Sequence, residues 1–128
     1  MKQQVKNWLD SALYDLETAE QMYESGRYIY TIFVGHLALE KILKAKVQEV
    51  TGRLPPKTRN LRHLVKLSSL KVPENMFEFL SKLSDVSIPT RYPENFEELV
   101  EAYDKRVVRK YADKTKEVFE WMRKSLNQ

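Results

Sequence analysis

The sequence lacks cysteine and contains few residues that break regular structure. The absence of cysteine among 128 residues excludes a disulfide framework, a thiolate metal site and a cysteine nucleophile. No apolar run approaches the roughly 18 residues of a membrane span. The first ten residues hold no apolar segment typical of a signal peptide. We therefore expect a cytoplasmic protein with no membrane segment, folded as a single domain over residues 1–128.

Several familiar catalytic and cofactor motifs are also missing. The chain has no glycine-rich phosphate loop and no serine-centred hydrolase motif. Only two histidines are present, His36 and His63, and a metal site needs several converging ligands. We expect no metal and no cofactor. The formal charge of +4 permits a phosphate-bearing partner, but a net charge of this size is equally typical of proteins in which it serves only to keep the protein soluble.

Apolar residues recur at intervals of three and four, the helical period, over most of the chain. The pattern predicts helices over residues 3–24, 27–50, 60–70, 74–86 and 102–126, with a short turn after Asn95. Gly26 suits the left-handed position that follows a helix. Segments 51–58 and 87–96 each hold two prolines and are predicted loops. No segment shows the strict alternation of apolar and polar residues that is typical of a β-strand. The predicted fold is therefore an all-α antiparallel bundle of about five helices around a long central hairpin.

The central stretch of the sequence is residues 27–50. Its first half is apolar on nearly every side, so we expect that half to be buried. Its second half narrows to one apolar stripe, so we expect it to emerge from the core. His36 lies in the apolar half, where the simplest interpretation is a core histidine with a satisfied hydrogen bond.

Four basic or titratable residues gather at the predicted start of the third helix: Lys57, Arg59, Arg62 and His63. A helix N-terminus already favours anions, so these cations are either tolerated there or used to bind phosphate. In the catalytic interpretation, His63 moves a proton at an RNA phosphodiester while Arg59 holds the developing charge. In the alternative, His63 is a surface histidine in a basic loop. A helix that begins at Thr58 places Arg59 and His63 on one face, whereas an Asn60 cap leaves Arg59 outside the helix.

Other polar residues fit a phosphate site or an ordinary structural role. Glu40 and Lys44 are four residues apart, which predicts an ion pair on the helix surface. Lys41 and Lys44 equally suit a groove for phosphate. Arg91 and Tyr92 lie in a proline-bounded loop and offer a charge and a stacking face for a nucleotide. In the alternative, Tyr92 packs on the bundle and Arg91 extends its head group to solvent.

Three short pieces of sequence, in this order, resemble the HEPN domain family of small α-helical proteins. They are Gly26-Arg27-Tyr28, the run from Ala38 to Ala45 (ALEKILKA) and Arg91-Tyr92-Pro93. The resemblance implies an antiparallel bundle, a homodimer and partnership with a separately encoded nucleotidyltransferase, often as a toxin–antitoxin pair. Many relatives are metal-independent ribonucleases. Their motif is an Arg, usually followed by a polar residue, and a His beyond a gap of four to six residues. This chain departs from that motif, because only three residues separate Arg59 from His63.

Three functional hypotheses follow. The first is a nucleotide- or RNA-binding protein that uses Glu40, Lys41, Lys44, Arg62, Arg91 and Tyr92 and acts with a nucleotidyltransferase. The second is a metal-independent endoribonuclease with His63 and Arg59 as catalytic residues. The third is a structural protein-interaction module.

Overall fold

The computed structural model describes residues 1–127, and at Arg91 it describes the backbone alone. Within that range there are six helices and no strand. They are α1 (Gln3–Glu24), α2 (Tyr28–Thr51), α3 (Leu61–Ser68), α4 (Glu74–Arg91), α5 (Phe96–Ala102) and α6 (Lys105–Lys124). None of these helices is long and apolar enough to cross a membrane.

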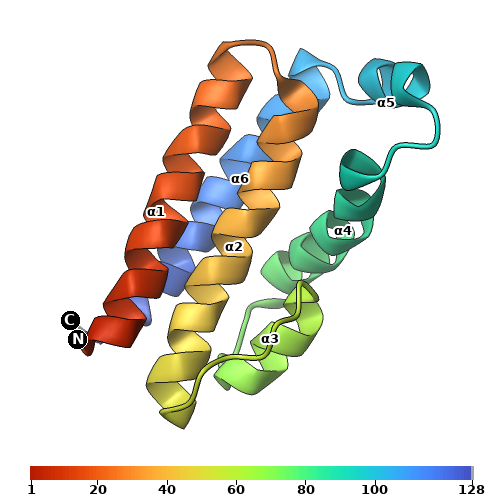
Figure 1. Ribbon diagram of the computed structural model, residues 1–128. Helices are drawn as coiled ribbons and strands as arrows, with labels where there is room; N and C mark the ends of the chain where they lie inside the picture. Colours follow the sequence, from red (N-terminus) through yellow and green to blue (C-terminus); the bar gives the residue numbers. More distant parts are fainter. Residues whose placement is uncertain (128) are drawn as a thin grey trace.

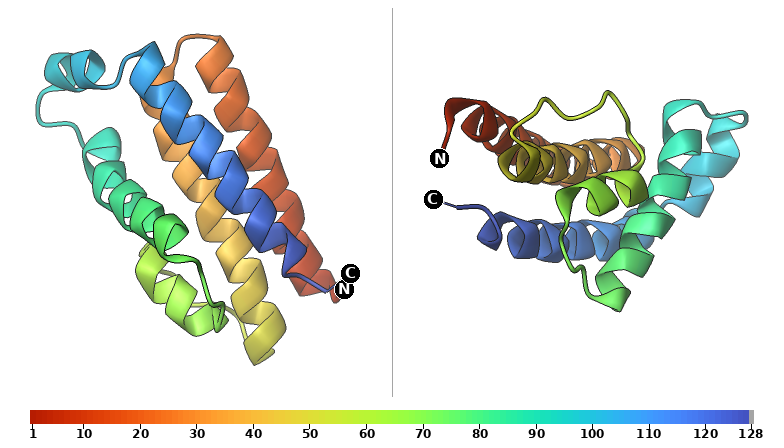
Figure 2. Two further views of the ribbon diagram at one scale, coloured as in Figure 1. Left: turned by 180° about the vertical axis from the view of Figure 1, so that it is seen from behind. Right: turned by 90° about the horizontal axis from the view of Figure 1, so that it is seen from below.

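Helix α2 is the centre of the bundle, as predicted, because it packs against each of the five other helices. Helices α1, α2 and α6 run side by side, α4 slants along the opposite flank of α2, and α3 crosses the lower end (Figures 1 and 2). Gly26, at φ +80°, closes the α1–α2 hairpin. Fully buried side chains from α2, α3, α4 and α6 form one core. Among the largest are Ile32, Leu39, Ile42, Leu43, Leu61, Leu64, Leu80, Leu83, Phe119 and Met122.

The predicted loop at residues 87–96 is partly wrong, because α4 continues through Pro89 to Arg91. Proline removes one helical N–H, which usually ends or kinks a helix. The lost hydrogen bond is the one to the Asp85 carbonyl, four residues earlier, and α4 extends only two residues beyond Pro89. The Tyr92 N–H still donates to the Ile88 carbonyl at 3.0 Å. The expected turn after Asn95 is the separate helix α5, which makes the count six rather than about five.

The predicted burial of α2 is also wrong in part. Tyr30, in the apolar first half, is 54% exposed, whereas Glu40 and Lys44, in the second half, are only 6% and 7% exposed. The Trp8 ring of α1 lies over Lys44, and the connection from Gly52 to Asn60 runs across the lower end of α2 (Figure 1). The apolar side at Tyr30 is covered less because α5 makes few contacts with α2.

Candidate functional site

The basic segment 57–63 begins outside helix α3. Asn60 is the N-cap, and its side chain accepts a hydrogen bond from the His63 backbone N–H at 3.2 Å. Arg59 therefore precedes the helix and does not share a helical face with His63. Lys57, Arg59 and His63 are all exposed. Neither Lys57 nor Arg59 has an acidic partner within residues 1–127, so both remain available to an anion from solution.

Arg62 has a different environment, because its guanidinium is held against helix α4. Its Nη2 donates to Asp85 Oδ1 at 3.0 Å and to the Ser81 carbonyl at 3.2 Å. An exposed ion pair of this kind contributes little stability, but it occupies the charge. Arg62 thus joins α3 to α4 and is less available to phosphate than Arg59.

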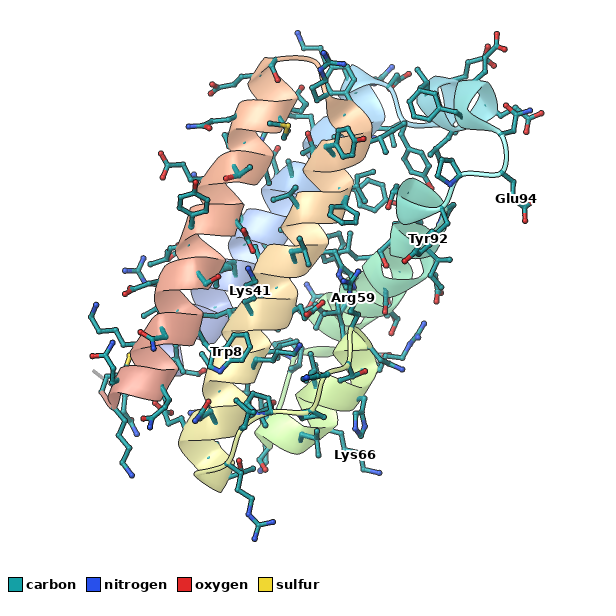
Figure 3. All side chains as sticks on the ribbon, viewed as in Figure 1. Trp8, Lys41, Arg59, Lys66, Tyr92 and Glu94 are labelled. Carbon is teal, nitrogen blue, oxygen red and sulfur yellow. The ribbon has the colours of Figure 1, made fainter. Side chains whose placement is uncertain are left out.

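Lys41 is bound to helix α1. Its Nζ lies 2.8 Å from Asp15 Oδ2 and donates to Ser11 Oγ at 2.8 Å. Figure 3 shows Lys41 on the part of α2 that faces α1, whereas Arg59 lies on the side of α4. The structure therefore does not bring Lys41 and Arg59 together on one wall.

Glu40 and Lys44 form a buried ion pair rather than a surface pair. Lys44 Nζ lies 3.0 Å from Glu40 Oε2 and 5.6 Å from the centroid of the Trp8 ring. The Trp8 indole N–H in turn donates to Gln48 Oε1 at 2.9 Å. Trp8 lies between α1 and α2 (Figure 3) and covers the lysine head group. This arrangement gives Lys44 a structural role.

His36 is fully buried on the same side of α2 as Glu40. Its Nδ1 lies 3.9 Å from Glu40 Oε1, one helical turn away. The predicted burial of His36 in the core is confirmed. Among residues 1–127, no three His, Asp or Glu side chains gather in a way that could hold a metal ion.

Tyr92 caps the far end of helix α4. Its ring is 74% exposed, so it does not pack on the bundle. It lies seven residues beyond Asp85, the partner of Arg62, which is about 10 Å along a helix. Tyr92 is thus separated from the segment 57–63 and lies near α5 (Figure 3). The side chain of Arg91 lies outside the described residues.

Two groups were not found from the sequence: the covering side chains Trp8 and Gln48, and the lysine partner Asp15. Both groups are joined to α2 by contacts between distant positions, which no local pattern reveals. The sequence also shows a dense run of basic residues from Lys105 to Lys116, which is typical of a solvated helix face.

Comparisons with known proteins agree with this architecture. A family model described as the HEPN domain matches residues 5–125. The structure is similar to TT1696 from Thermus thermophilus, with a TM-score of 0.79 and 22% identity, over 98% of this chain and 100% of that chain. It is also similar to ST0689, an archaeal HEPN homologue, with a TM-score of 0.76 and 22% identity, over 99% of this chain and 100% of the other. No curated protein sequence matches this chain.

Proposed function

Because this chain is a member of the HEPN domain family, we propose that it binds a nucleotide or RNA through the basic segment 57–63. One observation supports this most directly. Lys57 and Arg59 are exposed and have no acidic partner within residues 1–127, whereas Lys41, Lys44 and Arg62 are each paired. Of the residues suggested by the sequence, this segment holds the cations that are free to meet phosphate.

The chemistry of the segment suits phosphate. The Arg59 guanidinium presents several N–H donors in a planar fork, which matches two phosphate oxygens. The adjoining start of α3 contributes backbone N–H groups and the positive end of the helix dipole. His63, exposed in the same turn, adds a donor or acceptor that a phosphodiester can reach.

The family resemblance further supports a homodimer that acts with a nucleotidyltransferase, as part of a toxin–antitoxin system. A nucleotidyltransferase gene beside this one would support the pairing. Co-purification of the two products, and the mass of each assembly in solution, would test it. In the alternative of a structural interaction module, the protein would bind its partner but not RNA.

RNA binding can be tested by fluorescence anisotropy with a labelled single-stranded oligomer over a series of salt concentrations. We expect the logarithm of the affinity to fall linearly with the logarithm of salt. Arg59→Ala and Lys57→Ala should each weaken binding and lower the slope by about 0.7, the value for one single-strand phosphate contact. Lys71→Ala, an exposed lysine beyond α3, is the control. Absence of any salt-sensitive binding would refute the proposal.

The ribonuclease alternative has one observation in its favour: Arg59 and His63 are both exposed within five residues of chain. In that case His63 would act as the proton-transfer group and Arg59 would stabilise charge on the phosphate.

A further inference from the structure

The positive charge of the molecule is concentrated on helix α6. This helix carries eight lysines and arginines against three acidic residues, a formal charge of +5, whereas the whole chain has a formal charge of +4. The remainder of the chain is therefore close to neutral. An electrostatic partner of this protein would be drawn mainly to α6.

The cations of α6 divide into paired and free groups. Arg109 pairs with Glu20 and Asp113, and Lys114 pairs with Glu117. Lys105, Arg106 and Lys110 have no ion pair within residues 1–127 and are exposed. These three border a shallow hollow with Tyr23 and Arg109, which we call the basic hollow.

The floor of the basic hollow is held in place by several contacts. The Arg109 guanidinium carbon lies 4.3 Å from the Tyr23 ring centroid, and Arg109 Nη1 lies 2.9 Å from Glu20 Oε1. The hydrogen bonds to Glu20 are the main cause of the raised pKa of Arg109. The Tyr23 hydroxyl donates to the Lys105 carbonyl at 3.3 Å. Arg109 therefore fixes the floor, while the free cations form the rim.

A second hollow, the aromatic hollow, adjoins the first at the α1–α2 turn. The Tyr23 and Tyr28 rings lie 5.4 Å apart and link the two. The aromatic hollow has a volume of about 230 Å³, and its lining includes four aromatic residues and one cation. The lining residues are Tyr28, Tyr30, Phe96 and Tyr103, with Gly26, Arg27, Ile29 and Val100. This volume is below the roughly 300 Å³ at which pockets for whole small molecules begin, so the hollow suits one flat ring better than a complete nucleotide. Phe96 is 59% exposed.

The charges near the aromatic hollow indicate how a bound strand would be oriented. Arg27 lines the aromatic hollow, helix α5 carries Glu97 next to Phe96, and Asp104 caps the start of α6. These carboxylates repel phosphate from α5 but not a neutral base. A bound strand would therefore place its phosphates along the rim of α6 and a base against Phe96.

We propose that the basic and aromatic hollows together form a binding surface for single-stranded nucleic acid. Free cations that follow a backbone, next to exposed rings on which bases stack, are the combination that binds single strands without strong sequence preference. An acidic protein would use the cations but leave the rings unexplained. A duplex would not present unstacked bases. The inference rests on the proposed RNA-binding function and adds a second contact surface to the segment 57–63.

The test uses the whole chain with a fluorescein-labelled uridylate oligomer, a deoxyuridylate oligomer of equal length and a duplex RNA. The variant Lys105→Ala/Arg106→Ala/Lys110→Ala removes three free cations from the surface. Its control, Lys2→Ala/Lys71→Ala/Lys124→Ala, removes three exposed cations outside both hollows, with Lys124 at the opposite end of α6, and leaves the same net charge. We expect the α6 variant to lower the salt slope by about 2, from roughly 0.7 for each contact. The control should change the slope little.

The aromatic contribution is tested with Phe96→Ala, with Phe77→Ala as the control because Phe77 is a partly exposed aromatic residue on α4. We expect Phe96→Ala to weaken single-strand binding about tenfold without changing the salt slope. Thermal unfolding of each variant checks the fold. A ribose preference over deoxyribose would identify RNA as the strand.

Several outcomes would overturn the inference. Equal slope changes in the two triple variants would show a general charge effect. Duplex binding as tight as single-strand binding would remove the role of the rings. A Phe96→Ala variant that splits a dimer but keeps its RNA affinity would assign the aromatic hollow to a protein contact. If the wild type binds RNA but neither α6 nor Phe96 matters, this inference alone fails, whereas a wild type that binds no RNA also refutes the proposed function.

Discussion

Lys44 Nζ lies 3.0 Å from Glu40 Oε2 on helix α2, and both residues are more than nine-tenths buried. The pair lies beneath Trp8, whose ring centroid is 5.6 Å from the ammonium group. Removing two opposite charges from water is costly, and their attraction offsets that cost only while both are present. The pair therefore makes α2 sensitive to the loss of either partner.

The first prediction concerns this pair. Lys44→Met should lower the free energy of unfolding by about 3 kcal/mol or more, because it leaves the Glu40 carboxylate buried without its lysine partner. The double variant Glu40→Leu/Lys44→Met should recover most of that loss. Urea denaturation of both single variants and the double variant gives the coupling energy. Additive losses in the double variant would show that the two charges are stabilised independently.

The second prediction concerns Gly35, where α2 approaches α6. A Cβ at this position would lie 3.5 Å from Thr115 Cγ2, which is an ordinary van der Waals contact. Gly35→Ala should therefore stabilise the protein by about 0.5–1 kcal/mol through helix propensity and a less flexible unfolded chain.

Gly52→Ala is the matched control for Gly35→Ala. Gly52 follows α2 at φ +70°, a left-handed conformation that alanine adopts only with strain, so its substitution should destabilise by about 1 kcal/mol. Thermal melts of both variants measure the two effects. Destabilisation by Gly35→Ala would mean that Thr115 cannot accept the added methyl group.

The third prediction concerns pH. Burial raises the pKa of Tyr103, with a further increase from Tyr111 and an opposing effect of Lys82, and burial also raises the pKa of Tyr111. A raised folded-state pKa contributes stability that is fully present below the unfolded value of about 10 and is lost as pH rises through the folded value. The free energy of unfolding should therefore fall above about pH 10.

Tyr103→Phe/Tyr111→Phe should reduce the loss of stability at alkaline pH. The reason is that the variant lacks two hydroxyl groups that release protons on unfolding. Urea denaturation at a series of pH values measures the effect. The control is Tyr14→Phe, at a tyrosine that is 74% exposed. An equally steep fall in the double variant would assign the alkaline sensitivity to other groups.

The fourth prediction separates the ribonuclease alternative from simple binding. If His63 transfers a proton, RNA cleavage should persist in EDTA and fall by a hundredfold or more in His63→Ala. The side chain is exposed, so the substitution should leave the fold intact. Lys66→Ala, one turn away, controls for local charge. Undiminished cleavage by His63→Ala would exclude His63 from the mechanism.

Much of the fold was predictable from spacing alone. The three-and-four pattern gave residues 3–24 for the first helix, which are the bounds of α1, and Gly26 marked the turn. The pattern failed at Pro89, where α4 continues for two more residues although the proline cannot donate to the Asp85 carbonyl. The proline rule describes the average cost of proline, and spacing alone does not show that α4 tolerates the loss of one hydrogen bond in its last turn.

The candidate site was less predictable because charge availability depends on distant partners. Lys41 and Arg59 look alike in sequence, yet Lys41 is bound to Asp15 on another helix and Arg59 is free within the described residues. The burial of Glu40 depends in the same way on elements that pack over α2. Residue type and spacing identified the charged groups but not which of them face solvent.

The short α1–α2 hairpin also has a consequence for folding kinetics. Only residues 25–27 join the two helices, so their contacts are close in sequence and form with little loss of loop entropy. Arg109, by contrast, reaches Glu20 across 89 positions. We expect the hairpin to form in the folding transition state and the α6 contacts to form afterwards. Substitutions at Arg109 would then act mainly by accelerating unfolding, whereas substitutions between α1 and α2 would slow folding.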